Sequence, residues 1–281
     1  MQLIAHWVND LLEVAAAAGD LALELRPKSR ASAKRGPAGV VTEADVAVET
    51  LIRRELQQRF PRATIVSEET GPLTPPGPLT FYVDPIDGTV NYYHGLPYCS
   101  VSIAARSVDC TVAAVVHDIV GRVSYVAEAG QPPFLIRRDQ HSIASATPIQ
   151  VSETQQLRDA LLITGFSPDE HGEARRSARF LPVVLGMCED VRRFGAASLD
   201  LATVAIGRAD GYWETSVGGL WDVLAGAFLV AQAGGRSLVY HDQATGRAAA
   251  LSSNAAIHAE LAKATEAQFA GYDLFEAMGA A

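Results

Sequence analysis

The sequence predicts a mixed α/β protein in which an antiparallel sheet fills the N-terminal half and strands alternate with helices in the C-terminal half. Three observations support this prediction. Two helical patterns lie before residue 61, short β-type runs separated by Asp, Gly and charged residues fill 98–136, and β-type and helical segments alternate after about residue 155. Such alternation is typical of α/β layers. We expect one compact unit with subdomains at residues 1–150 and 151–281.

The first two helices are predicted by apolar spacing. Apolar residues recur at three- and four-residue steps from Ile4 to Leu25, and Pro27 ends this pattern. Residues 28–39 are basic and contain Gly and Pro, which predicts a loop that could act as a lid. The second helix is expected to begin at Thr42, because Asp45 stands three residues later in the form of a capping box.

The remaining elements are expected from shorter runs. Strands are predicted at 64–66 and 81–83, and an antiparallel meander at 100–105, 111–116 and 122–127. In the C-terminal half, strands are predicted at 161–163, 191–194, 211–213 and 237–240, and helices at 173–185, 198–206 and 221–233. The glycine pair at 234–235 stops the last of these helices.

The composition excludes several classes of protein. The 281 residues are 48% apolar and 20% charged, and the formal net charge of −9 disfavours non-specific binding to nucleic acid or anionic membranes. Three separated cysteines (Cys99, Cys110 and Cys188) disfavour a disulfide framework or a cysteine zinc site. No apolar run approaches the roughly 18 residues of a membrane span, and the N-terminus lacks a signal-type segment. We therefore expect a cytoplasmic protein with no nucleic-acid or membrane partner.

The strongest candidate for chemistry directly follows the β-type run at 81–83. It reads Asp84-Pro85-Ile86-Asp87-Gly88-Thr89. Two carboxylates three residues apart, around the carbonyl of Ile86, supply the hard oxygen ligands that Mg²⁺ requires. The amides of Gly88 and Thr89 could receive phosphate oxygens. An acidic turn without a metal fits this run equally well, because Asp and Gly are common in turns.

Other acids stand where a predicted element meets a loop. Glu68 follows the run at 64–66, Asp45 lies at a helix start, and Asp222 lies in the first turn of the helix at 221–233. Each one alone is explained by helix capping or by the helix dipole, but together they lie where sites are usually assembled. The sequence contains no P-loop, no H-E-x-x-H helix and no G-x-S-x-G elbow that would indicate another chemistry.

These segments resemble the inositol monophosphatase family. Residues 83–97 resemble the first signature of that family, residues 221–235 resemble the second, and residues 41–45 and 67–69 match two further segments in the right order. Lys34 matches the lysine of the family's loop. The resemblance runs to about residue 254 and implies the layered α-β-α-β-α fold that this family shares with fructose bisphosphatases.

The resemblance also implies roles for matching positions. It implies two to three Mg²⁺ ions, held by Glu68, Asp84, the carbonyl of Ile86, Asp87 and Asp222, with Asp84 bridging two of them. It implies that Thr89, hydrogen-bonded to Asp45, orients or activates the attacking water, and that Glu68 shares this work through a third, weaker ion. The amides of Gly88 and Thr89 would hold the phosphate. The polyol-contacting positions would be Gly195, Ala197 and Glu214.

The predicted reaction is Mg²⁺-dependent, lithium-sensitive hydrolysis of a phosphate monoester of a small polyol, with inositol monophosphate as the first choice. The resemblance implies a homodimer. Two departures bear on the substrate: the segment from Glu214 to Asp222 is one residue longer than expected and contains Gly218-Gly219, and Gly39 stands where an acid is common. Histidinol phosphate, fructose 1,6-bisphosphate and 3′-phosphoadenosine 5′-phosphate are alternative substrates. A regulatory binding protein that keeps the fold is an alternative of another class.

Overall fold

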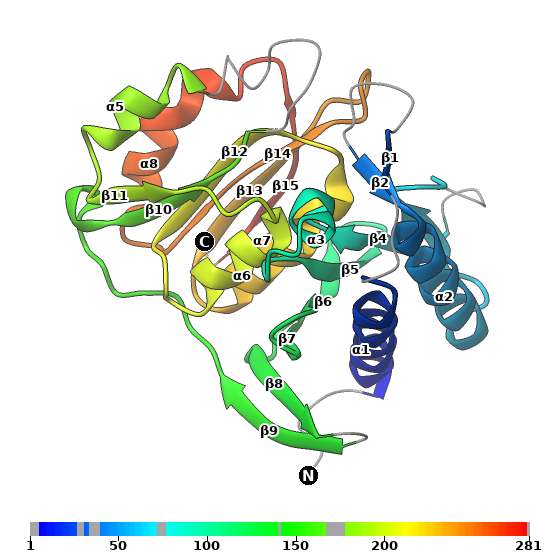
Figure 1. Cartoon of the computed structure of the whole chain (residues 1–281). Coiled ribbons are helices and arrows are strands. Elements are labelled where there is room, and N and C mark those ends of the chain that lie inside the picture. Colours follow the sequence, from blue (N-terminus) through cyan, green and yellow to red (C-terminus); the bar gives the residue numbers. More distant parts are fainter. Residues whose placement is uncertain are drawn as a thin grey trace.

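The chain folds into five alternating layers of helices and sheets (Figure 1). The structure is a computed structural model that describes residues 6–26, 31–33, 40–71, 77–139, 142–166 and 178–279. Two helices cover one face of a seven-stranded sheet, two lie between this sheet and a six-stranded sheet, and two cover the outer face of the latter. In layer order these helices are α1 (His6–Leu25) and α2 (Glu43–Arg59), α6 (Ala197–Ala205) and α7 (Leu220–Gln232), and α5 (Leu181–Leu185) and α8 (His258–Thr265). This arrangement confirms the predicted fold class.

The seven-stranded sheet contains the predicted meander and extends it. Its strands follow the chain order: β3 (Thr64–Ser67), β4 (Leu79–Asp87), β5 (Ser100–Ser107), β6 (Thr111–Asp118), β7 (Val123–Glu128), β8 (Phe134–Asp139) and β9 (Ser142–Pro148). Only β3 and β4 pair in parallel, and every other neighbouring pair is antiparallel. A separate two-stranded sheet joins β1 (Ala31–Ala33) to β2 (Val40–Thr42), which leads into α2.

The six-stranded sheet has the order β11-β10-β12-β14-β13-β15. Its strands are β10 (Leu161–Thr164), β11 (Asp190–Arg192), β12 (Gly211–Val217), β13 (Arg236–His241), β14 (Ala248–Ser253) and β15 (Asp273–Met278). Strand β10 is parallel to both β11 and β12, and the remaining pairs are antiparallel. The chain changes sheets between β9 and β10, close to the predicted boundary at residue 150, and the division into two subdomains stays a proposal.

The helix predicted at 173–185 is tested only over its last part, because residues 167–177 lie outside the described part. A turn at 179–180 shows that the predicted continuous helix is wrong there, and α5 follows this turn. Pro182 stands in the first turn of α5, where its missing N–H has no intrahelical partner to lose. The predicted loop with Lys34 and Gly39 also lies outside the described residues.

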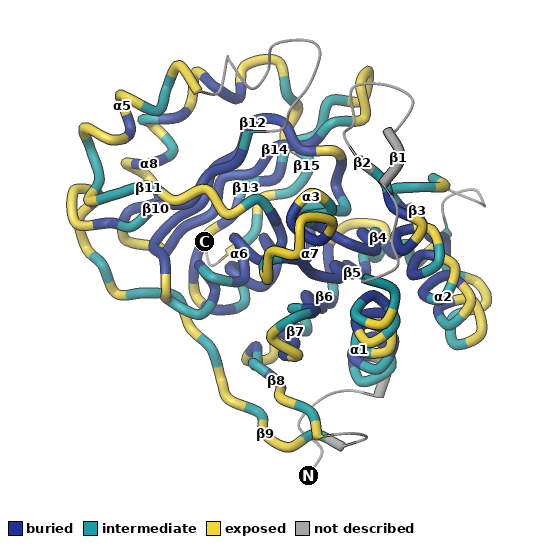
Figure 2. The backbone as a smooth tube through the Cα atoms, in the orientation of Figure 1, coloured by how far each residue is buried: buried dark blue, intermediate teal, exposed yellow. Residues whose placement is uncertain are grey.

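The layer between the sheets is the most apolar part of the molecule. Nearly every residue of α7 is buried, as the dark tube in Figure 2 shows, because the helix packs on a sheet at either side. Gly226 allows α7 to cross α6 closely, since a Cβ at Gly226 would lie 2.4 Å from the Cβ of Leu201. This crossing fixes the N-terminal ends of both helices beside the end of β4. Within the described residues, no helix is both long and apolar enough to cross a membrane.

Candidate metal centre

The end of β4 presents two carboxylates to the same side. In a regular strand, residues three apart point to opposite faces. Asp84 pairs with Ser102 and Asp87 with Ser100, so three steps along β4 match two along β5 and the strand bulges between them. Pro85 lies in this bulge, where its missing N–H disturbs no ladder, and the amide of Ile86 bonds to Asp84 Oδ1 at 3.0 Å. The bulge therefore brings both aspartates to one site.

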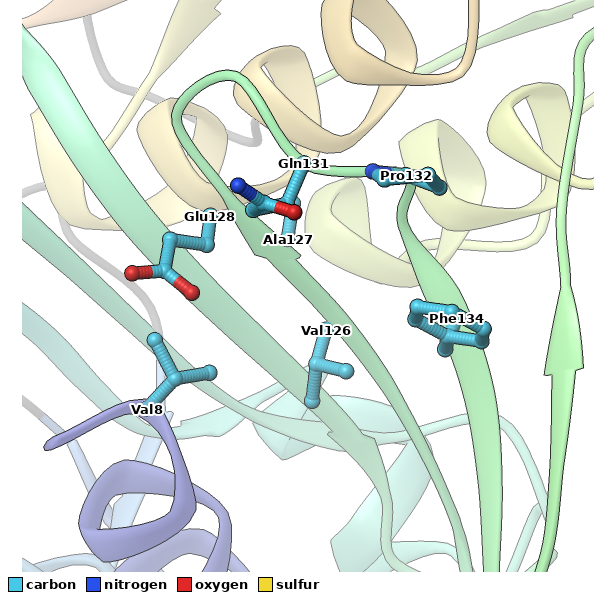
Figure 3. A pocket seen from close by; sticks show the side chains of 7 residues that line it. All are labelled: Val8, Val126, Ala127, Glu128, Gln131, Pro132 and Phe134. Carbon is cyan, nitrogen blue, oxygen red and sulfur yellow. The ribbon is translucent and has the colours of Figure 1, made fainter. Parts of the chain in front are cut away.

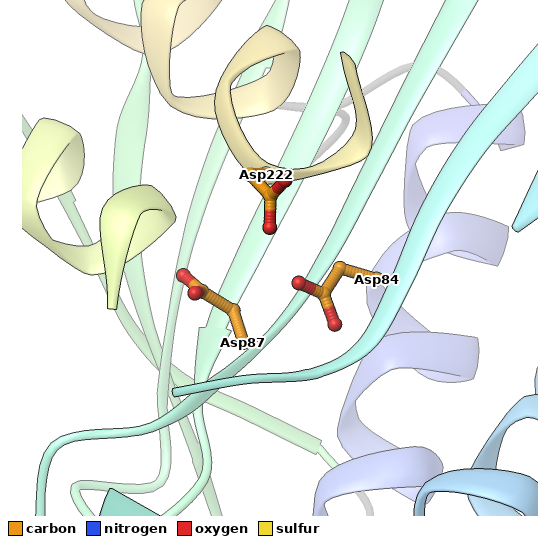
Figure 4. A group of neighbouring side chains, drawn as sticks. All are labelled: Asp84, Asp87 and Asp222. Carbon is orange, nitrogen blue, oxygen red and sulfur yellow. The ribbon is translucent and has the colours of Figure 1, made fainter. Parts of the chain in front are cut away.

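Asp222 completes the group from the other half of the chain. It is the third residue of α7, and its Oδ2 accepts a hydrogen bond from the amide of Gly219 at 2.6 Å. Oxygens of Asp84, Asp87 and Asp222 all lie within 4.8 Å of one another, and Figure 4 shows the three side chains converging. The structure thus brings together three of the predicted metal ligands, which are 138 positions apart at the extremes of the sequence.

Electrostatic repulsion among these three carboxylates favours the binding of a cation between them. Asp84 and Asp87 are only 1% and 6% exposed. Burial, with the charge of Glu68, raises the pKa of Asp87 to about 6, and burial raises the pKa of Asp222 well above its usual value, with further contributions from Glu68 and Asp87. Buried carboxylates that repel one another are stabilised by a divalent ion, and their oxygens are the hard donors that Mg²⁺ prefers.

Glu68 lies at the same site but outside the group of three. It follows β3, and its amide bonds to the carbonyl of Val83 on β4 at 3.2 Å. Its charge raises the pKa of Asp45, Asp87 and Asp222. The tight group of acidic oxygens consists of the three aspartates, so among the described residues Glu68 occupies a more peripheral position. This agrees with a role at a further ion.

Asp45 and Thr89 meet beside the metal group. Asp45 is fully buried, and its Oδ2 accepts hydrogen bonds from the amide and the hydroxyl of Thr42 at 2.8 and 2.5 Å. The bond from the amide is one half of the predicted capping box, and in the other half the Thr42 side chain accepts from a backbone amide of the first turn. The hydroxyl of Thr89 lies 3.2 Å from Asp45 Oδ1 and 3.0 Å from the carbonyl of Ile86. Because a hydroxyl carries one proton, it donates to one of these oxygens and keeps lone pairs that can accept a hydrogen bond from another group.

Gly88 occupies a position that only glycine fits well. Its φ is +82°, and a Cβ there would lie 3.0 Å from both the carbonyl of Tyr98 and the Cβ of Ala196. It caps α3 (Thr89–Tyr93), so the chain turns from β4 into a short helix directly beside the metal group. The predicted phosphate-binding amides of Gly88 and Thr89 therefore lie next to the carboxylates.

Two serines hold Asp87, and the sequence reasoning missed both of them. Asp87 Oδ2 accepts hydrogen bonds from the amide and the hydroxyl of Ser198, each at 2.7 Å, and Ser100 Oγ lies 3.5 Å from the same oxygen and 2.8 Å from Ser198 Oγ. The amide of Ala197 bonds to Asp87 Oδ1 at 3.2 Å. Ala197, predicted to contact the polyol, thus uses its amide at the first turn of α6 to orient an aspartate.

Glu214 lies in β12, close enough to Asp87 to feel its charge. It is 8% exposed, accepts a hydrogen bond from the hydroxyl of Tyr212 at 2.8 Å, and packs so closely on Gly165 that a Cβ there would lie 2.0 Å from Oε2. Burial raises the pKa of Glu214 to about 7, and the charge of Asp87 adds to the rise. Gly195 has a φ of +91°, and its carbonyl oxygen accepts a hydrogen bond from the side-chain amide of Asn91 at 3.4 Å.

Strand β12 contains a bulge directly after Glu214. Glu214 pairs with Ala250 and Val217 with Ala248, so three steps along β12 match two along β14. The bulge lies within the segment from Glu214 to Asp222, which is expected from the sequence to be one residue longer than in the family, and Gly219 and Asp222 follow it at the start of α7.

A separate concavity has the wrong chemistry and size for a substrate site. It lies between α1 and the β7–β8 turn and is lined by Val8, Val126, Ala127, Glu128, Gln131, Pro132 and Phe134 (Figure 3). Its cavity volume of about 10 Å³ is at the lower limit for one water molecule. The carboxylate group at the end of β4 is therefore the better candidate site.

Comparison with known proteins agrees with this site. The sequence model of the inositol monophosphatase family matches residues 5–270. A protein of Synechocystis sp. named inositol-1-monophosphatase is 35% identical over 267 residues, which cover 93% of this chain and 89% of that protein. A protein of Pseudomonas aeruginosa named Nus factor SuhB is 38% identical over 201 residues, covering 69% of this chain and 70% of that protein.

Solved structures show the same fold. The structure of an inositol monophosphatase from Anabaena superimposes with a TM-score of 0.76 at 32% identity, covering 93% of this chain and 95% of that chain. The likeness therefore extends over most of both chains.

Proposed function

Because the chain belongs to the inositol monophosphatase family of phosphoric monoester hydrolases, we propose that it hydrolyses inositol monophosphate with Mg²⁺ as its cofactor. The observation that supports this most is the convergence of Asp84, Asp87 and Asp222 within 4.8 Å. These three residues, Glu68 and the carbonyl of Ile86 would hold two to three ions. Bound ions would lower the pKa of the attacking water, neutralise the phosphate and stabilise the leaving oxygen.

The chain's own groups would position the reactants. Amides of Gly88 and Thr89 would donate hydrogen bonds to phosphate oxygens at the turn from β4 into α3. The Thr89 hydroxyl would accept a hydrogen bond from the attacking water while it donates to Asp45, so that a proton leaving the water passes towards the Asp45 carboxylate. Asp45 is suited to this work because Thr42 fixes its other oxygen.

Glu214 would select the leaving group. Its buried carboxylate can accept hydrogen bonds from two neighbouring hydroxyls of a polyol, and Gly195 and Ala197 would form the floor beside it. The names of the Synechocystis and Anabaena relatives support inositol phosphate as the substrate. The bulge after Glu214 is the feature that favours testing histidinol phosphate, fructose 1,6-bisphosphate and 3′-phosphoadenosine 5′-phosphate as well.

A substrate panel with and without Mg²⁺ tests this proposal. We expect hydrolysis of inositol 1-phosphate with the highest kcat/KM of the panel, loss of turnover in excess EDTA and inhibition by lithium. Full turnover in EDTA would refute the metal mechanism. A hundredfold preference for a non-polyol phosphate, which is about 2.7 kcal/mol in transition-state binding, would refute the substrate while it leaves the mechanism intact.

A second role as a binding partner is supported by the Pseudomonas relative, whose name is Nus factor SuhB. The two roles separate in an Asp87→Asn variant, which changes the metal site and leaves the surface unaltered. If hydrolysis accounts for the cellular role, the variant loses both. A variant that loses hydrolysis but complements a deletion strain would favour the binding role. The homodimer and the cytoplasmic location remain predictions that sedimentation and fractionation can check.

A further inference from the structure

Helix α2 carries a buried polar stripe that continues beyond Asp45. Glu49 and Arg53 follow Asp45 at four-residue steps, so the three side chains lie along one side of the helix. Their exposed fractions are 0%, 1% and 7%. Charged side chains are rarely buried to this extent unless they are paired, and Glu49 and Arg53 do not belong to the carboxylate centre described above. Their burial therefore requires another explanation.

The side chains of Glu49 and Arg53 form hydrogen bonds with the turn that follows β3. Glu49 Oε2 accepts a hydrogen bond from the amide of Glu69 at 3.0 Å, and its Oε1 accepts one from the hydroxyl of Thr70. Arg53 Nη1 donates to the carbonyl of Gly71 at 3.2 Å and lies 3.6 Å from Glu49 Oε1. One buried ion pair thus binds three consecutive residues of a single turn.

Glu68 is the first residue of this turn. Its amide is fixed to β4 through the carbonyl of Val83 at 3.2 Å, and the next amide along the chain is fixed to Glu49. The backbone that carries the Glu68 carboxylate is therefore held from both sides. Outer contacts of this kind typically change metal affinity or activity by roughly 10- to 100-fold when they are removed.

We propose that Glu49 and Arg53 are positioning residues that set the Glu68 carboxylate for a cation, an inference that rests on the proposed metal role of Glu68. Glu49 supplies the acceptors that orient the turn, and Arg53 compensates the buried charge of Glu49. Successive turns of helix α2 then position both groups that are proposed to activate the water. Asp45 positions Thr89, and Glu49 with Arg53 positions Glu68 for its ion. Neither Glu49 nor Arg53 touches the substrate in this arrangement.

Calorimetric titration with Mn²⁺ tests the proposal without relying on turnover. In Glu49→Gln, one carboxylate oxygen becomes an amide that cannot accept from the turn, and we expect the weakest Mn²⁺ site to lose about tenfold in affinity, with the tighter sites unchanged. Glu55→Gln is the matched control, because it removes an acid on the same helix that pairs with Arg54 and Arg59. This control should bind Mn²⁺ as the wild type does.

A double variant separates positioning from stability. Glu49→Gln alone leaves Arg53 as an unpaired buried charge and should lower the thermal midpoint, whereas Glu49→Gln/Arg53→Gln removes that charge and should recover part of it. The proposal predicts that the weakest Mn²⁺ site stays weak in the double variant. Mn²⁺ affinity that recovers together with stability would show a merely structural role and overturn the proposal, as would wild-type affinity in Glu49→Gln.

A milder change decides the matter if Glu49→Gln does not fold. Thr70 is exposed, so Thr70→Val removes one hydroxyl contact to Glu49 and should weaken the same Mn²⁺ site by about threefold. Unchanged affinity in this variant would overturn the proposal. Failure of the proposed function is a different result: the wild type itself would then bind no Mn²⁺ or release no phosphate from any tested monoester.

Discussion

The proposed metal side of the site, around Asp45 and Asp87, and the proposed leaving-group side, around Glu214, are built differently. On the metal side, Asp45 and Asp87 each accept hydrogen bonds on both carboxylate oxygens from groups on helix ends and neighbouring elements. On the leaving-group side, Glu214 accepts a side-chain hydrogen bond from Tyr212 within its own strand, and a bulge begins directly after it. Several hydrogen bonds thus orient each of these carboxylates on the metal side. On the leaving-group side, one carboxylate is oriented by one side-chain hydrogen bond, and the neighbouring backbone of β12 forms the rest of the surface.

This difference indicates which property of the enzyme can change readily. We expect a change on the proposed metal side to break several contacts between separate elements and to abolish the reaction with them. The proposed leaving-group side has fewer such contacts, and the bulge between Glu214 and Val217 lies beside it. We therefore expect substitutions near Glu214 to change the substrate preference while the reaction is retained.

The largest effect is expected from Asp84→Asn on the metal side. The asparagine keeps the acceptor for the amide of Ile86 but removes a charge that the ions require. Metal ions contribute several kcal/mol to such reactions, so we expect kcat to fall about a thousandfold or more. The metal-free variant should be at least as stable as the wild type, because one of several repelling buried charges is gone.

Phosphate release and thermal unfolding with and without Mg²⁺ measure both effects. The matched control is Asp118→Asn, which changes a carboxylate at the end of β6 that bonds to the turn amides of Val120 and Gly121. This control should keep its turnover. Turnover near that of the wild type in Asp84→Asn would show that the metal side does not govern the reaction.

The next effect is expected from Ser198→Ala, which removes a hydroxyl from Asp87 while the backbone contact remains. We expect the Mg²⁺ concentration for half-maximal activity to rise about tenfold, because this contact orients a ligand. Ser237→Ala removes a comparable buried hydroxyl, which bonds to the carbonyl of Ala227, and serves as the control. An equal Mg²⁺ requirement in both variants would show that the Ser198 hydroxyl does not orient Asp87 for metal binding.

A smaller and more selective effect is expected from Glu214→Gln. The glutamine can still accept from Tyr212 but loses the charge that strengthens hydrogen bonds to polyol hydroxyls, so kcat/KM for inositol 1-phosphate should fall about tenfold. Hydrolysis of p-nitrophenyl phosphate, which has no hydroxyl for Glu214, should change little. Equal losses on both substrates would place Glu214 on the metal side and remove the distinction between the two regions.

Glu214 also predicts a pH dependence. Its pKa is raised from 4.5 to about 7 by burial, so the carboxylate ionises as the pH rises through about 7. The ratio of kcat/KM for inositol 1-phosphate to that for p-nitrophenyl phosphate should therefore increase across this range in the wild type and stay flat in Glu214→Gln. Burying this charge destabilises the metal-free fold progressively as the pH rises from 4.5 to about 7.

The smallest effect on turnover is expected outside both regions, at His117. This side chain is buried against Gly19 and bonds to Ser124 Oγ, and burial lowers its pKa from 6.5 to about 4. The stabilisation from burying the neutral ring is complete above pH 6.5 and is lost as the pH falls towards 4. The difference between these two pKa values corresponds to a loss of roughly 3 kcal/mol in the free energy of unfolding.

The variant His117→Asn should lack this pH dependence and keep its turnover. Urea unfolding of the metal-free protein between pH 4 and pH 7 would measure the free energy of unfolding for both proteins. If the free energy of unfolding changes with pH equally in the wild type and in the variant over this range, the pKa of His117 is not lowered by its burial. A loss of turnover would show that the sheet below α1 is coupled to the site.

The sequence predicted those parts of the site that follow local rules. Asp84 and Asp87 lie in one short run, and Asp45 and Asp222 lie in first turns of helices, so a strand end and two helix starts indicate them. The hydroxyl of Ser198 reaches Asp87 across 111 residues of sequence, and no local spacing reveals such a contact. The stripe of Glu49 and Arg53 was missed for a related reason: charged residues on a helix usually face solvent.

The fold was predicted to a similar extent. Strongly periodic helices and β-branched strands were found, whereas β14 was missed because its sequence is rich in alanine, which has little preference for strands. It forms a central strand because β12 and β13 pair with it from both sides and every one of its residues is buried. Tertiary context of this kind is not contained in local propensity.

Anomalous diffraction from crystals soaked in Mn²⁺ would locate the ions relative to the three aspartates. We expect anomalous peaks within coordination distance of Asp84, Asp87 and Asp222, a weaker peak beside Glu68, and loss of these peaks in Asp84→Asn crystals. Mn²⁺ found elsewhere on the molecule, with no peak between the three aspartates, would contradict the proposed metal centre.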